Sequence, residues 1–235
     1  MPRILIPIVG LALAVVGSAC GSSSSGSSST TTSSSTAGGG TAASDKALAQ
    51  QINLQAGDFP TGWESQPSDS SGGGTASTRQ LLTCLGASSS LAATTVNVDS
   101  PNFSQSRSPG ELDAGSNVAF APTAAQAAGT FRAFSSSKAN SCVQSVLAAE
   151  LQRQKVSAPG GLNVTSARVT VPSGDQGVAF SATTSVVAQG QTVPVEFQIT
   201  LVGRGRAEIS LLTGGFAAAF PQSLQQSLLA AMISR

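Results

Sequence analysis

The alternation of residues 193–211 constrains the fold of this chain more than any other feature. Every odd position in this range is apolar or glycine, whereas the even positions are mostly polar. A period of two is typical of β-strands with one buried face. The stretch is too long for one strand, and residues 203–205 (Gly-Arg-Gly) supply a turn. Residues that pair across two strands share a face of the sheet, so apolar odd positions on both strands require a loop with an odd number of residues. We predict a three-residue loop that pairs Val202 with Arg206 and places Gly205 in the left-handed region.

Other segments extend this hairpin into a mixed fold. Strand-like runs at 162–171 and 178–186 precede it, so residues 162–213 read as a four-strand antiparallel meander with one apolar face. Residues 94–98 and 116–121 form an early strand pair. Helical spacing predicts helices at residues 46–55, 79–85, 123–134, 140–155 and 216–234. The sequence therefore predicts an α+β fold, in which helices cover one face of an antiparallel sheet made of the meander and the early pair.

The N-terminus is typical of an exported protein. Arg3 precedes an apolar run at 4–17, and small residues lead up to Cys20, which makes residues 1–19 a signal peptide. A cysteine directly after such a site resembles the lipobox of bacterial lipoproteins, which implies a diacylglyceryl thioether on Cys20 and attachment to the outer face of the cell membrane. Gly17 departs from the Leu, Val or Ile usual in that motif. Ordinary cleavage after Ala19, which would give a secreted protein, is the alternative.

A low-complexity segment separates Cys20 from the folded part. Residues 21–44 contain 16 Ser or Thr among 24 residues and no charge, a composition that cannot form a core. We therefore assign residues 20–44 to a lipidated, disordered tether and residues 45–235 to a single α+β domain.

Two cysteines remain if Cys20 carries lipid. Cys84 and Cys142 would lie in an oxidising compartment after export, and there we expect them to form a disulfide. Two separate buried thiols are the alternative.

Composition excludes several activities. Removing Arg3 with the signal peptide leaves eleven Lys and Arg against eleven Asp and Glu, so no basic excess exists for nucleic acid. Histidine is absent, which removes Ser-His-Asp and Cys-His catalysis and imidazole metal ligands. The close acidic pair Glu111 and Asp113 is interpreted as a solvated surface pair. We expect no cofactor, no metal, no catalytic residue and no enzymatic activity.

Three residues are candidates for binding contacts. Trp63, the single tryptophan, lies in a turn-rich segment and either pins that loop to the core or stacks on a ligand. Arg204 and Arg206 lie at the expected hairpin tip. There they form either a solvated charged end that discourages strand addition or a contact for an anionic headgroup or partner.

The order of elements, the Ala/Gly/Ser-rich composition and the segment 58–63 (Asp-Phe-Pro-Thr-Gly-Trp) resemble small extracytoplasmic lipoproteins of mycobacteria and related actinobacteria. That resemblance implies a Mog1/PsbP-like sandwich. A second resemblance is to the extracellular sensor domain of mycobacterial serine/threonine kinases, which usually has more cysteines. The expected function is a lipid-anchored envelope lipoprotein that acts as a non-enzymatic binding or adaptor module for an envelope protein, glycan or lipid. The alternative is a carrier of an apolar ligand between sheet and helices.

Overall fold

The computed structural model describes residues 41–68, 74–171, 175–188 and 190–235. The predicted signal peptide, Cys20 and most of the predicted tether lie outside the described residues. Within the described ranges no helix is long and apolar enough to cross a membrane.

The described chain alternates between helices and strands in an order close to the predicted one. In chain order the elements are α1 (Ala42–Ile52), η2 (Ala56–Asp58), β1 (Glu64–Gln66), α2 (Gly74–Leu85), η3 (Ser89–Ala92), β2 (Val96–Asp99), β3 (Asn102–Ser106), β4 (Glu111–Phe120), α3 (Ala124–Phe134), α4 (Ala139–Arg153), β5 (Leu162–Arg168), β6 (Gln176–Ala188), β7 (Gln191–Arg204), β8 (Ala207–Phe216) and α5 (Gln222–Ser234).

All described strands belong to one antiparallel sheet. Its order is β1-β3-β4-β8-β7-β6-β5, with β2 pairing the far half of β4 beside β3. The predicted meander is confirmed as β5–β8, and the predicted early pair is confirmed as β2 and β4. These two parts join because β4 pairs with β8 along its whole length. The α+β prediction is thus confirmed.

The predicted register of the long hairpin is wrong. Arg204 pairs with Ala207 across a two-residue loop, and Val202 pairs with Ile209 instead of Arg206. Even positions of β7 therefore share a face with odd positions of β8. Alternation could not reveal this because both faces of the sheet are covered by helices. The apolar odd positions of β7 face the α4 side, whereas the apolar odd positions of β8 face the α5 side. Gly205 does take the predicted left-handed conformation, with φ of +57°.

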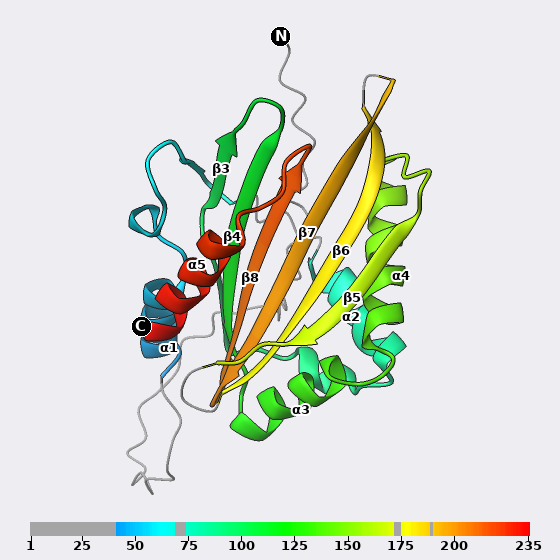
Figure 1. The fold of residues 1–235 in the computed structure, drawn as a ribbon. Coiled ribbons are helices and arrows are strands. Elements are labelled where there is room, and N and C mark those ends of the chain that lie inside the picture. Colours follow the sequence, from blue (N-terminus) through cyan, green and yellow to red (C-terminus); the bar gives the residue numbers. More distant parts are fainter. Residues whose placement is uncertain (1–40, 69–73, 172–174, 189) are drawn as a thin grey trace, which may run out of the picture.

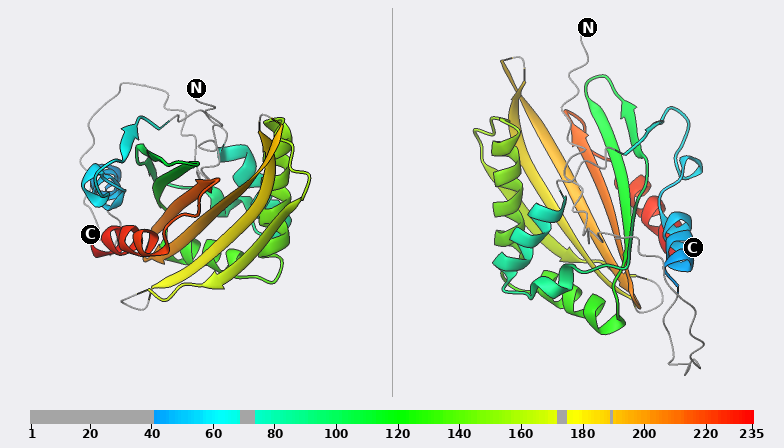
Figure 2. Two further views of the ribbon diagram at one scale, coloured as in Figure 1. Left: turned by 45° about the horizontal axis from the view of Figure 1, so that its top comes forward. Right: turned by 180° about the vertical axis from the view of Figure 1, so that it is seen from behind.

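Helices lie on both sides of the sheet (Figures 1 and 2). We call the side that carries Phe180 and Phe197 the α4 face, because α2, α3 and α4 pack there. The other side, which carries Val118 and Ile209, is the α5 face, and α1 and α5 cover it over β4 and β8. The expectation of helices on one face therefore holds for β5–β7 but not for β4 and β8.

The two expected cysteine partners form a disulfide. Cys84 on α2 and Cys142 on α4 are bonded with an S–S distance of 2.03 Å, which confirms the predicted pair. The bond ties two helices of the α4 face together, and Cys142 lies buried in the core beneath them.

Two helix boundaries differ from the prediction. The first helix begins at Ala42 with Thr41 as its cap, inside the range assigned to the tether, and Thr41 Oγ1 accepts a hydrogen bond from Ser44 N at 3.3 Å. At the other end, β8 continues to Phe216, so α5 begins at Gln222 instead of residue 216. The intervening residues 217–221 cross back over the sheet and form one wall of the site described next.

Candidate ligand-binding groove

Polar side chains form two adjacent rows across β5, β6 and β7 on the α5 face. The register places Asn163, Thr183 and Glu196 side by side in the first row. Two residues further along the strands, the second row consists of Thr165, Ser181 and Gln198. Neighbouring strands lie about 4.8 Å apart, so each row presents hydrogen-bonding groups at that spacing. The buried residues of α5 pack against β4 and β8, so they leave this part of the α5 face open beside the helix.

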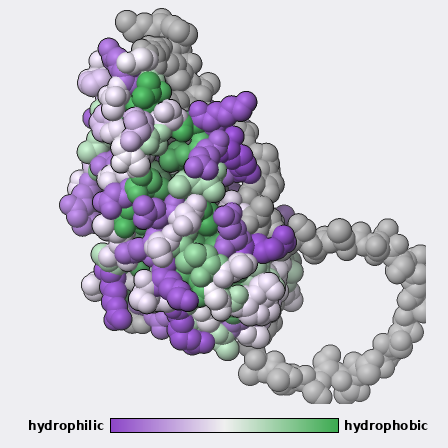
Figure 3. All heavy atoms as spheres, turned by 90° about the vertical axis from the view of Figure 1, so that its right-hand side faces the viewer, coloured by the Kyte–Doolittle hydropathy of each residue, from purple (hydrophilic) through white to green (hydrophobic). Residues whose placement is uncertain are grey.

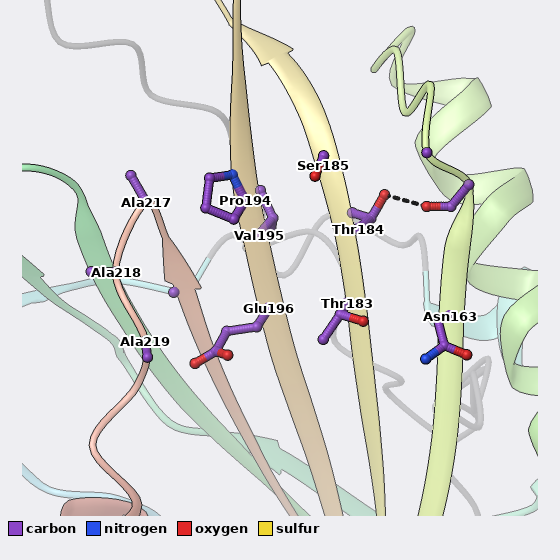
Figure 4. Close-up of a pocket in the computed structure, with 13 residues that line it drawn as sticks. Asn163, Thr183, Thr184, Ser185, Pro194, Val195, Glu196, Ala217, Ala218 and Ala219 are labelled. Carbon is purple, nitrogen blue, oxygen red and sulfur yellow. Dashed lines mark hydrogen bonds between the residues drawn. The ribbon is translucent and has the colours of Figure 1, made fainter.

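The first row forms the floor of an open groove of about 510 Å³. In Figure 4 the side chains of Asn163, Thr183 and Glu196 cross the three strands, and Glu196 points toward the segment Ala217–Ala219. That alanine segment is one wall. The opposite end is formed by the loop at Gly160 and Gly161, where Thr184 Oγ1 donates to Gly161 O at 2.6 Å.

Gly215 allows the alanine wall to lie close to the sheet. It pairs with Glu196 in the first row, and a Cβ there would lie 1.9 Å from the carbonyl oxygen of Ala218. Ala217 enters the crossing with φ of +56°, and its N–H donates to Pro194 O at 2.9 Å. Only a residue without a side chain fits at position 215, so this glycine fixes the wall.

Glu196 connects the floor to the end of that wall. Its Oε1 accepts a hydrogen bond from Phe220 N at 2.7 Å, just before α5 begins. The carboxylate thereby replaces solvent for a backbone donor at a point where the chain is irregular. Glu196 is therefore a positioning residue for the wall as well as part of the floor.

A smaller pocket of about 100 Å³ continues the groove toward α5. It shares Thr183 and Glu196 with the larger part, and Gln225 and Phe220 close its inner end. The Nε2 atom of Gln225 is buried and has no hydrogen-bond partner. A buried donor without a partner at the end of a pocket is uncommon and points to a further hydrogen-bonding molecule there.

Trp63 lies in an aromatic cluster behind this inner end. Its ring centroid is 4.8 Å from that of Phe59 and 5.9 Å from that of Phe220, and Phe59 in turn stacks on Phe103 at 4.3 Å. Trp63 thus packs its loop onto the core, which is the first of the two roles considered for it from the sequence. Through Phe220 it also supports the groove.

Both candidate arginines are engaged within the chain. Arg204 Nε donates to Asp175 at 2.9 Å. Arg206 Nη2 binds both carboxylate oxygens of Asp45, and the guanidinium lies 5.6 Å from the ring centroid of Phe120. The Arg206 side chain is only 16% exposed. Neither arginine projects freely into solvent as expected for a charged hairpin tip, and neither lines the groove.

Two carboxyl groups titrate far from their usual range. Burial, with a smaller contribution from Glu111, raises the pKa of Asp113 to about 7. Burial also raises the pKa of Glu208 to about 7, partly offset by a hydrogen bond from Thr130. Glu111 and Asp113 lie on β4 and both are partly buried, so the interpretation of a solvated surface pair does not hold for Asp113. Among the described residues, no cluster of acidic or thiol groups could hold a metal ion.

The described part of the α4 face offers little room for an apolar ligand. Two pockets between the helices and the sheet, beside Phe197 and beside Phe131, measure about 40 Å³ each. A water molecule needs roughly 10–15 Å³ on the same scale, so each holds a few waters and no acyl chain. On the side where α4 and β5 lie, hydrophilic side chains separate small apolar patches (Figure 3).

The groove could not be found from the sequence, although its polar residues could be. Thr183, Glu196 and Gln198 are polar residues of the alternating strands, and alternation alone assigns such residues to solvent. What brings them together is the register of three strands and the return of residues 217–221 over β8. Neither follows from residue spacing.

The comparisons with known proteins identify no family. No family model matches the chain, and no curated protein matches it. Two solved structures from Mycobacterium tuberculosis show a distant likeness. LpqN, described as involved in cell envelope biogenesis, is 12% identical with a TM-score of 0.31, covering 75% of this chain and 78% of LpqN. The extracellular domain of PknH is 11% identical with a TM-score of 0.33, covering 81% and 97%. At such scores neither likeness carries an argument about this chain.

Proposed function

We propose that this chain is an exported, lipid-anchored binding module of the cell envelope, which holds a polar partner in the groove over β5–β7. The groove of about 510 Å³ is the observation that carries this proposal. Its volume lies in the range of small-molecule and short-segment sites. The disulfide is consistent with an oxidising compartment outside the cytoplasm.

The groove is suited to binding without chemistry. Glu196, the ionisable side chain of its floor, is engaged with Phe220 N, and the chain contains no histidine to act as a proton-transfer partner. The remaining floor groups are amides and hydroxyls, which recognise a ligand by hydrogen bonds. An adaptor that presents the groove to an envelope component therefore fits better than an enzyme.

Photo-crosslinking in the producing organism tests this proposal. A benzoylphenylalanine at Ser185, which lines the groove, is expected to form adducts with an envelope component. Thr183→Trp fills the floor and should abolish the adducts. Thr192→Trp is the matched control because Thr192 is exposed on β7 outside the groove lining. Adducts that survive Thr183→Trp, or that never form, would contradict the proposal.

A further inference from the structure

The groove has a charge pattern that selects against ionic ligands. Among the described residues that line its two parts, Glu196 is the ionisable one, and Lys and Arg are absent from that lining. A phosphate or carboxylate ligand would find no countercharge and would meet the field of Glu196. A cation would meet a single carboxylate whose Oε1 already accepts the N–H of Phe220.

The floor instead provides groups that both donate and accept hydrogen bonds. Asn163, Thr183, Ser181 and Gln198 each carry a donor and an acceptor, as does every sugar hydroxyl. Within each row these groups lie at the strand spacing of about 4.8 Å, close to the width of a pyranose ring. A ring lying across the rows could therefore place hydroxyls over neighbouring strands.

The walls fit the apolar faces of such a ring. The segment Ala217–Ala219 and the exposed Pro194 present methyl and methylene groups without hydrogen-bonding side chains. Sugar rings have C–H faces between their hydroxyls, and these faces gain from contact with apolar side chains. The inner pocket beside Phe220 and the unpartnered Nε2 of Gln225 could take a substituent with a hydrogen-bond acceptor.

From these observations we infer that the polar partner is a neutral saccharide segment that lies along the groove. This inference rests on the proposed binding function and specifies its ligand class. It predicts that recognition involves the Thr183 hydroxyl directly, at the centre of the first row.

The test uses the full-length chain in detergent micelles and saturation-transfer NMR. The probes are neutral trisaccharides of glucose, mannose, galactose, arabinose and N-acetylglucosamine, with a trigalacturonate as the anionic comparison and a glucosamine trimer as the cationic one. At least one neutral trisaccharide is expected to bind, and neither charged trimer should bind more tightly. Thr183→Val should weaken that binding about five- to tenfold, because it removes one hydrogen bond while keeping the side-chain shape. Thr192→Val, the same change outside the groove, should leave it unchanged.

The outcomes separate this inference from the proposed function. If no neutral trisaccharide binds, if a charged trimer binds best, or if the two valine variants behave alike, the saccharide inference is wrong. In that case, loss of the envelope adducts in Thr183→Trp would still support the groove as a binding site for another partner. If the adducts persist in Thr183→Trp, the groove itself is not the binding site.

Discussion

Arg206 and Asp45 are separated by 161 residues, yet Arg206 Nη2 lies 2.8 and 2.7 Å from the two carboxylate oxygens of Asp45. The pair joins the start of α1 to the turn between β7 and β8. Arg206 also donates to the carbonyl oxygen of Ala121 at 3.3 Å. The first helix is therefore fixed to the sheet by a largely buried ionic contact.

Arg206→Met should lower the free energy of unfolding by about 3 kcal/mol, because it leaves the buried Asp45 carboxylate without its partner. Arg107→Met is the control, since Arg107 is exposed and its Nε donates to the uncharged side chain of Gln105, so this change should cost less than about 1 kcal/mol. Urea unfolding of both variants measures the difference. Equal losses would show that burial of the Arg206 pair has no effect on stability.

Gly215→Ala should displace the alanine wall and destabilise the fold by roughly 1–3 kcal/mol, since the new methyl group would meet the Ala218 carbonyl oxygen. The amide resonance of Phe220 should shift as its bond to Glu196 is disturbed. Gly57→Ala is the control, because nothing lies within 4 Å of a Cβ there. An unchanged Phe220 resonance in Gly215→Ala would contradict this account of the wall.

Glu208 should make stability depend on pH. Its pKa is raised by burial from 4.5 to about 7 in the folded chain, so the folded state binds this proton more tightly than the unfolded state. The stabilising effect is complete below about pH 4.5 and is lost as pH rises to about 7, by about 3 kcal/mol for this group. Glu208→Gln should remove about half of the slope in urea unfolding from pH 4 to 8, because Asp113, whose pKa burial also raises to about 7, contributes a similar slope. The exposed Glu64→Gln should not, and a full slope remaining in Glu208→Gln would disprove the assignment.

Removing the Cys84–Cys142 bond should cost about 4 kcal/mol in the chain-entropy model for a separation of 58 residues. The double variant Cys84→Ala/Cys142→Ala should therefore melt at a clearly lower temperature than the oxidised chain. Peptide mapping under non-reducing conditions should recover the linked pair from the exported protein. Two thiols that react with alkylating agents in that protein would refute the bond.

Cys20 should carry the lipid anchor. Mass spectrometry of membrane-extracted protein is expected to find a diacylglyceryl adduct on a chain that begins at this residue, and Cys20→Ala should release the protein into the medium. Unmodified soluble protein beginning at Cys20 would show that the ordinary signal peptidase processes the chain.

Most helices and strands could be predicted from the sequence, but the register in which the strands pair could not. Alternation identified all four strands of β5–β8, and helical spacing placed α3 and α4 within about a residue of their observed starts. The register of Val202 with Ile209 could not be predicted because an apolar residue of either parity fits where both faces of a strand are covered. The short strands β1 and β3 were missed because their pairing, and not their own pattern, stabilises them.

The candidate site was harder to predict than the fold. Arg204 and Arg206 attracted attention as charged residues at a turn, yet both have carboxylate partners elsewhere in the chain. Thr183 and Asn163 carry no such signal, and they become a site only when β5, β6 and β7 lie side by side. The chemical type of each side chain follows from the sequence, whereas the groove exists only once the strands of the sheet are assembled.

The contact between Asp45 and Arg206 also fixes the end of the sheet at which α1 begins. It places the start of α1 at the end of the sheet where β7 turns into β8, whereas Gly215 in the groove wall lies nine residues beyond Arg206 along β8. At about 3.3 Å per residue, that separation is roughly 30 Å. The start of α1 and the groove wall therefore lie toward opposite ends of β8, so a partner bound in the groove would be held about that far from the point where the described chain begins.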